Sequence, residues 1–149
     1  MITIKNLSKI FNTQGETIRA LNQVSLEIQK GEFVAIMGRS GSGKSTLLNI
    51  LGCMDKASSG TYLLSNKDIS QLSDDQLSKI RNERIGFVFQ GFHLLPRLSA
   101  LENVMLPLRY SNLGTTETGI NRAKELLNKV GLKDRMYQDR KSTRLNSSH

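Results

Sequence analysis

Eight consecutive residues have the types and the spacing of a phosphate-binding loop. They fit the pattern G-x-x-x-x-G-K-[S/T] and are Gly38, Arg39, Ser40, Gly41, Ser42, Gly43, Lys44 and Ser45. Its glycines let the backbone curl closely around phosphate oxygens, and Lys44 supplies an ammonium for the β- and γ-phosphates. The Ser45 hydroxyl is placed to bind Mg²⁺. We expect a nucleoside triphosphate to bind along this loop and the next residue, Thr46, with Lys44 as a catalytic group.

The flanking segments suit a loop of this kind. An apolar run at residues 33–37 predicts a buried strand that delivers the chain to the loop, and residues 45–51 have helical character. The N-terminus of such a helix directs free backbone N–H groups at an anion. A second apolar run, residues 85–89, predicts another buried strand. Gln90 follows it, where ligands of open α/β sheets bind.

The other elements follow from periodicity and capping signals. Alternating apolar residues predict short strands at residues 1–5, 18–21, 24–28 and 61–64. Capping boxes at Ser73 and Ser99 open helices that we expect to reach about Arg84 and Tyr110. A last helix, ending at Gly131, carries an apolar face. The residues of that face are Ile120, Ala123, Leu126, Leu127 and Val130.

Composition excludes several classes of protein. No apolar run approaches the ~20 residues of a membrane span, and the N-terminus does not read as a signal peptide. The single cysteine, Cys53, excludes an intramolecular disulfide and suits a packing role. The formal charge of +8 is scattered, with no tryptophan and no basic stripe interleaved with aromatics. We therefore favour solvated basic faces over a nucleic-acid or lipid surface, and expect no nucleic-acid partner.

Three segments together resemble the ATP-binding subunit of an ABC transporter. They are residues 20–32 with the loop that follows, residues 51–61, and residues 85–104. The residues of these three segments most resemble the branch of the family that serves lipoprotein release and macrolide or peptide export. The resemblance implies an α/β fold, an incomplete P-loop NTPase core of the ABC ATPase type. It also implies an N-terminal antiparallel β subdomain and the start of a helical subdomain.

The resemblance also assigns roles to single residues. Gln90 matches the family's Q-loop glutamine, which ligates Mg²⁺ and acts in catalysis; spacing alone would make it a surface glutamine. Phe11 takes the place of the adenine-stacking aromatic, and its alternative is an ordinary core aromatic. Arg39 stands where the branch often has proline, so its guanidinium lies near the phosphates or faces solvent.

A membrane permease is the partner that the resemblance implies. The stretch between Phe92 and Val104 is similar to the part that grips the permease's coupling helix. Leu94, Leu95 and Leu98 suit a groove for that helix, or they close the helical subdomain's own core. The resemblance further implies a head-to-tail homodimer at full length, held peripherally on the cytoplasmic face of the plasma (inner) membrane.

Several parts of the family's hydrolytic machinery have no counterpart in the sequence. There is no apolar run followed by Asp-Glu, no Leu-Ser-Gly-Gly-Gln signature and no matching switch histidine. The signature should begin soon after Tyr137. We therefore expect residues 1–138 to form a partial ABC ATP-binding domain and residues 139–149 to be a non-native tail. Such a fragment binds ATP but does not hydrolyse it.

Other P-loop classes fit less well. A GTPase needs Asn-Lys-x-Asp, but in Asn66-Lys67-Asp68 the aspartate comes one place early. Nucleotide kinases usually open directly on the strand before the loop, whereas some thirty residues precede it here. The alternative that stays open is a short nucleotide-binding protein without ATPase activity.

Overall fold

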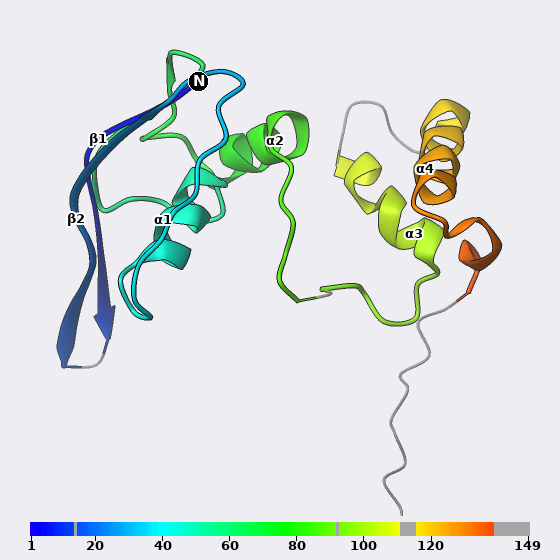
Figure 1. The fold of residues 1–149 in the computed structure, drawn as a ribbon, viewed down its shortest axis with the longest axis horizontal. Helices are drawn as coiled ribbons and strands as arrows, with labels where there is room; N and C mark the ends of the chain where they lie inside the picture. The colour runs from blue at the N-terminus through cyan, green and yellow to red at the C-terminus, as the bar shows by residue number, and fades with distance from the viewer. Residues whose placement is uncertain (14, 92, 111–115, 139–149) are drawn as a thin grey trace, which may run out of the picture. The chain divides into compact units, whose positions relative to one another are not determined.

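The computed structural model describes residues 1–13, 15–91, 93–110 and 116–138. The chain divides into two compact units, Met1–Gly86 and Phe87–His149. The first unit carries the phosphate-binding loop, and the second is helical (Figure 1).

The first unit contains an antiparallel sheet of four strands in the order β2-β1-β3-β4. A long hairpin joins β1 (Ile2–Thr13) to β2 (Glu16–Ile28), and β3 (Ser59–Leu64) pairs with the other edge of β1. The short strand β4 (Lys67–Asp68) completes the sheet. Residues 18–21 and 24–28, predicted as separate strands, are thus one strand.

Irregularities in the hairpin explain why its length was not predicted. The β1–β2 register shifts three times between Ile4 and Ile10. Each shift interrupts the alternation of apolar and polar residues from which strands are predicted. Two serine hydroxyls satisfy backbone N–H groups here, Ser25 Oγ accepting from Asn6 and Ser8 Oγ from Gln23, at 2.9 Å each.

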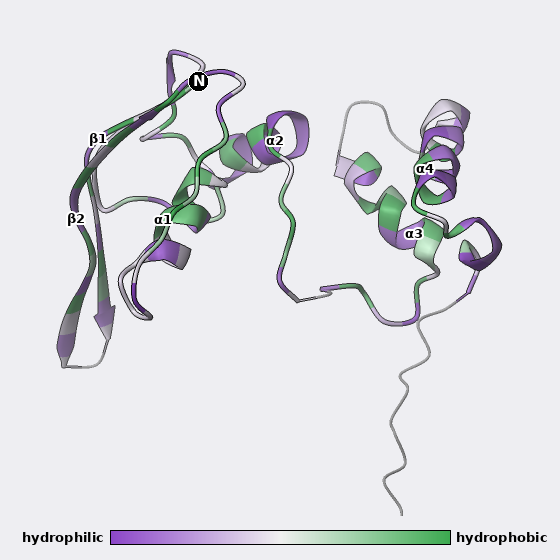
Figure 2. Cartoon of the chain, viewed as in Figure 1, coloured by the Kyte–Doolittle hydropathy of each residue, from purple (hydrophilic) through white to green (hydrophobic). Residues whose placement is uncertain are grey.

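Helix α1 (Lys44–Leu51) begins at the phosphate-binding loop and packs with the sheet. Figure 2 shows the apolar stretches of α1 and of the strands that contribute to this core. Its buried residues are Ile4, Leu7, Leu21, Leu47, Ile50, Leu51, Cys53, Tyr62, Ile69 and Leu77. Tyr62 lies deep in it, and its hydroxyl donates to the Leu51 carbonyl at 2.7 Å. The loop's helix is therefore anchored to the sheet through a shared core.

The two buried strands predicted at residues 33–37 and 85–89 are not formed, so these predictions were wrong for this chain. Both segments lack strand structure, and Phe33, Met37 and Val88 are 94%, 89% and 97% exposed. Only Ile36 and Ile85 pack against the core. Within the described residues no strand pairs with either segment. A strand needs such a partner for its backbone groups and a packed layer for its side chains.

Helix α2 (Asp74–Arg84) confirms the predicted capping box. Ser73 Oγ accepts from the Gln76 amide at 3.3 Å, and Gln76 Oε1 accepts from the Ser73 amide at 2.9 Å. Acidic residues occupy the first turn and Arg81 and Arg84 the last, as the helix dipole favours. Both ends of α2 were thus readable from the sequence.

The second unit contains α3 (Ala100–Met105), η1 (Leu106–Tyr110), α4 (Glu117–Lys129) and η2 (Lys133–Arg135). The Ser99 capping box is confirmed, but the helix becomes 3₁₀ after Met105, where Pro107 has no N–H for an α-helical bond. Of the face predicted on α4, Ala123 and Leu127 are buried while Leu126 and Val130 are exposed. The unit's core is Leu101, Ala123, Leu127 and Met136.

Candidate nucleotide-binding site

The phosphate-binding loop and β2 enclose a cavity in the first unit. Its volume is about 560 Å³. The lining residues are Ile18, Arg19, Ala20, Ser40, Gly41, Gly43, Lys44, Ser45 and Thr46. Six of these residues were predicted to bind the nucleoside triphosphate. The three from β2 were not, because no local pattern connects a strand to a loop twenty residues further along the chain.

Gly43 lets the loop approach β2 closely. Its φ of 87° lies in the left-handed region, where it forms the N-cap of α1. A Cβ atom added here would collide with the Ala20 carbonyl oxygen and lie 3.0 Å from Leu21 Cδ2. Conformation and space therefore both require glycine at this position.

Lys44 holds the loop together from within. Its ammonium donates to the carbonyl oxygens of Gly38 at 2.8 Å and Arg39 at 2.6 Å, and lies 3.4 Å from Ser42 Oγ. The three loop residues that do not line the cavity are thus gathered around Lys44. The Arg39 side chain itself is exposed, which favours its solvent-facing alternative.

The N-terminus of α1 is open to an anion. In the part of the chain that the structure describes, no side chain caps this end, and its first turn holds no acidic residue. Lys44, Ser45 and Thr46, which form that first turn, all line the cavity. Backbone N–H groups in a first turn have no partner within their own helix, and the helix dipole favours negative charge there.

Phe11 lies beside this cavity on the neighbouring strand. In the β1–β2 ladder it is paired with Ile18, which lines the cavity, and directly paired residues project from the same face of a sheet. Phe11 is 39% exposed, so it is not a core aromatic. The Lys9 ammonium lies 4.9 Å from its centroid.

Gln90 belongs to the second unit, whereas the loop belongs to the first. It is exposed and follows the extended segment at residues 85–89. Its roles as a magnesium ligand and a catalytic residue stay predictions.

The leucines predicted to meet a permease helix lie just before α3. Leu94 and Leu95 are exposed and Leu98 is half-buried, and none of them belongs to the unit's core. The alternative that they close this core is therefore wrong. Phe92 lies outside the described residues. Asn103, for which no sequence pattern predicts a role, fixes the loop before α3: its side chain accepts from the Leu95 amide at 2.9 Å and donates to the Leu98 carbonyl at 3.2 Å.

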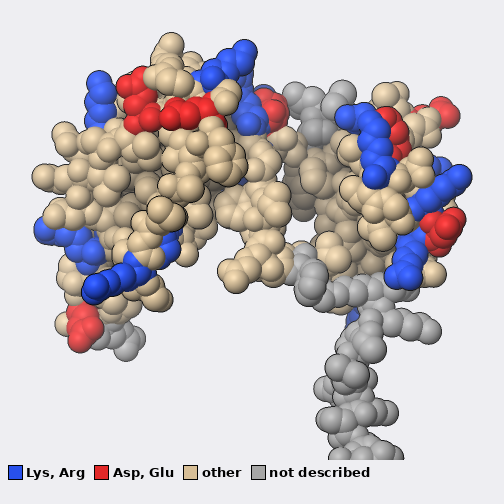
Figure 3. Space-filling view, in the orientation of Figure 1, with Lys and Arg blue, Asp and Glu red and all other residues tan. Residues whose placement is uncertain are grey.

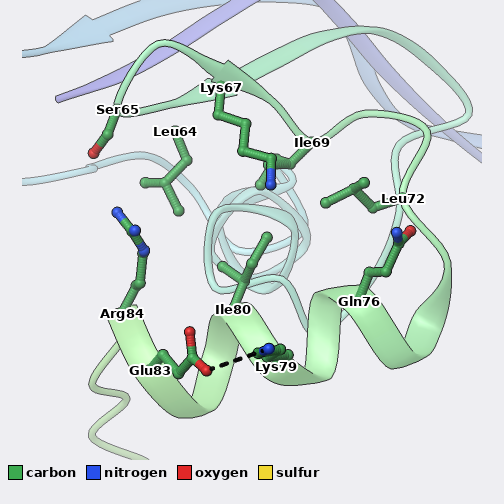
Figure 4. Close-up of a pocket in the computed structure, with 10 residues that line it drawn as sticks. All are labelled: Leu64, Ser65, Lys67, Ile69, Leu72, Gln76, Lys79, Ile80, Glu83 and Arg84. Carbon is green, nitrogen blue, oxygen red and sulfur yellow. Dashed lines mark ion pairs between the residues drawn. The ribbon is translucent and has the colours of Figure 1, made fainter.

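A second cavity of the first unit lies between α2 and the β3–β4 hairpin (Figure 4). Its volume is about 650 Å³, and its apolar floor is edged by Lys67, Lys79 and Arg84. Lys79 pairs with Glu83 at 3.9 Å. None of the predicted site residues lines this cavity.

Charge is dispersed over the molecule. Figure 3 shows Lys and Arg side chains interspersed with Asp and Glu on the face in view.

Burial raises the pKa of the Cys53 thiol, with Arg81 acting in the opposite direction, which agrees with a packing role. The described residues include no group of three or more His, Cys, Asp or Glu that could hold a metal ion. Nor does any helix among them have the length and apolar character needed to cross a membrane.

Comparison with known proteins places the chain in one family. The family described as "ABC transporter" matches residues 21–148. An uncharacterized ABC transporter ATP-binding protein of Bacillus subtilis, YvrO, is 54% identical over 91% of this chain and 59% of its own length. The macrolide export ATP-binding/permease protein MacB of Mannheimia succiniciproducens is 48% identical over 89% of this chain and 20% of its own length.

A solved structure agrees with this placement. The ATP-binding cassette MJ0796 of Methanocaldococcus jannaschii, in a dimeric post-hydrolysis state bound to ADP and Pi, matches with a TM-score of 0.82 and 48% identity. The match covers 92% of this chain and 60% of that one. This chain thus spans about 60% of the length of the cassettes it matches. It belongs to the ABC transporter family and has part of the fold of that family's ATP-binding cassette.

Proposed function

We propose that this chain binds ATP with Mg²⁺ at the cavity between the loop and β2. The observation that carries the proposal is the uncapped N-terminus of α1, whose first-turn residues Lys44, Ser45 and Thr46 line this cavity. The structure of the MJ0796 cassette, at 48% identity, is bound to ADP and Pi, which supports a nucleotide as the ligand. Helix N-terminal amides and an ammonium are the groups that bind phosphate oxygens.

On binding, Lys44 exchanges partners. Its ammonium is held by carbonyl oxygens of the loop. A phosphate oxygen carries more negative charge than a carbonyl oxygen, so the ammonium transfers to the β- and γ-phosphates. Gly43 keeps the loop close to β2 while the amides of the first turn of α1 donate to the same phosphates.

The residues present fit a magnesium ion that accompanies the nucleotide. Mg²⁺ prefers oxygen ligands and usually takes one or two from the protein, the rest being phosphate oxygens and water. Ser45 lines the cavity and offers a hydroxyl, whereas an amide oxygen from Gln90 is a ligand that the family resemblance alone implies. The ion would neutralise phosphate charge when bound.

We further propose that this chain does not hydrolyse the ATP it binds. Hydrolysis needs a carboxylate that positions or activates water, and the sequence contains no Asp-Glu pair after an apolar run. A short nucleotide-binding protein without ATPase activity would share this property.

In the intact transporter we propose the role of ATP-binding subunit of an exporter, coupling ATP binding and hydrolysis to movement of substrate by a membrane permease. MacB proteins are named as export ATP-binding/permease proteins, and the MJ0796 cassette is dimeric. The exposed Leu94 and Leu95 would meet the permease, and two subunits would pair head to tail. Such a subunit lies on the cytoplasmic face of the plasma (inner) membrane through its permease.

Calorimetric titration of the full chain with ATP·Mg²⁺ tests the binding proposal. Lys44→Ala should lose a charge-assisted contact and weaken affinity at least about tenfold. Lys30→Ala makes the same change at an exposed position outside the cavity and should leave affinity unchanged. Equal affinity of wild type and Lys44→Ala would refute the site.

A further inference from the structure

Lys9 is held by three groups at once. Its ammonium donates to Asp55 Oδ1 at 2.6 Å and to the Lys56 carbonyl at 2.7 Å, and it lies 4.9 Å from the centroid of the Phe11 ring. The Lys9 side chain is 13% exposed. A lysine side chain gives up much rotamer freedom when it is held in this way. Its position is therefore specified by contacts, unlike that of a surface lysine.

Asp55, the ion-pair partner of Lys9, lies in the turn that follows α1. Backbone hydrogen bonds from Met54 to Asn49, at 2.8 Å, and from Cys53 to Ile50, at 3.0 Å, fix this turn to the helix. The Asp55 carboxylate is oriented by the Lys56 amide, which donates to the same Oδ1 at 2.7 Å. Lys9 thus connects β1 to the helix whose N-terminus forms the phosphate site.

The contact with Phe11 leaves the ring able to stack. An ammonium within about 6 Å of an aromatic centroid is attracted to the ring's negative face. Lys9 occupies one face of the ring, and Phe11 keeps exposed surface on the strand position paired with Ile18, at the cavity. A nucleobase can stack on the open face, and such stacking tolerates any base because every base has a π face.

We propose that Lys9 is a positioning residue for the base of the bound nucleotide. It fixes the Phe11 ring relative to the phosphate-binding loop, through Asp55 on one side and the ring on the other. The inference rests on the proposed function. Because Lys9 does not line the loop cavity, its removal should affect ligands that carry a base and spare ligands that consist of phosphates alone.

The test compares ATP·Mg²⁺ with tripolyphosphate·Mg²⁺ by calorimetry on the full chain. Lys9→Met keeps the length of the side chain and removes the charge, and it should weaken ATP affinity about three- to tenfold. Tripolyphosphate affinity should not change, and Lys9→Arg, which retains a cation, should recover part of the loss. Lys5→Met makes the same charge change at an exposed position of β1 and should affect neither ligand.

A second pair of variants tests whether Lys9 acts through the ring. In a Phe11→Leu background, Lys9→Met should cause no further loss of ATP affinity. If Lys9→Met fails to fold, Asp55→Asn replaces it, since it removes the charge that holds the ammonium.

The possible failures are distinguishable. A wild type that binds neither ligand refutes the proposed function and this inference with it. A wild type that binds both, with variants that lose both equally or lose neither, refutes the role of Lys9 alone.

Discussion

Replacing Gly43 by alanine should destabilise the first unit more than the same change at Gly41. Both glycines have left-handed backbone, with φ of 87° and 78°. Alanine in this region costs about 1–2 kcal/mol at either site. At Gly43 the new Cβ would also collide with the Ala20 carbonyl oxygen, whereas at Gly41 it meets nothing within 4 Å.

The collision sets the difference between the two variants. Ala20 lies in β2 between Arg19 and Leu21, which are paired with Ile10 and Lys9, so its carbonyl cannot retreat far without moving these two pairs. Overpacking of this kind adds about 1–3 kcal/mol, so Gly43→Ala should lower the free energy of unfolding by about 2–5 kcal/mol and Gly41→Ala by about 1–2 kcal/mol.

Urea denaturation followed by far-ultraviolet circular dichroism measures both values. The midpoint should move and the slope should stay constant, since only the folded state is changed. Equal losses at the two glycines would refute the close approach of the loop to β2. A larger loss at Gly41 would refute the loop geometry itself.

Three further predictions concern other parts of the chain. Tyr62→Phe removes the bond to the Leu51 carbonyl and should cost about 1 kcal/mol of unfolding free energy in urea titrations; no loss would exclude this bond as a stabilising contact. Hydrogen bonds from the Ser99 backbone and hydroxyl hold the pKa of Glu102 below its usual value. The ionised carboxylate therefore stabilises α3 fully when the pH is above the usual pKa of glutamate, and this stabilisation is lost as the pH falls through the lowered pKa. Amide exchange of α3 in wild type and Glu102→Gln should therefore converge as the pH falls through this lowered pKa, and a constant difference would contradict the linkage. Finally, the full chain should release no phosphate from ATP above buffer, and turnover abolished by Lys44→Ala would contradict the missing carboxylate.

Elements specified by local signals were predictable from the sequence. The capping boxes at Ser73 and Ser99 begin α2 and α3, because each needs only residues within one turn. The phosphate-binding loop is likewise a local pattern, and it opens α1 where the sequence indicates. The ABC-type fold was predicted from the resemblance of three longer sequence segments to the family. It is confirmed by the family match and by the cassette structure.

Features that depend on distant partners were not predictable. Residues 33–37 and 85–89 have the composition of buried strands, but within the described residues neither has a strand beside it. The contact between Lys9 and Asp55 joins residues 46 positions apart, and neither residue type is unusual where it stands. The β2 residues that line the loop cavity were missed for the same reason, since only the tertiary fold brings them to Gly43.

The most direct test of the account is to map ATP·Mg²⁺ onto the backbone amides of the full chain by nuclear magnetic resonance. The account predicts that the amide signals of Gly43, Lys44 and Ser45 shift with added nucleotide, while those around the second cavity, at Lys67 and Lys79, do not. Shifts confined to the second cavity, or no shifts in the loop at saturating ATP, would contradict the assignment of the nucleotide site.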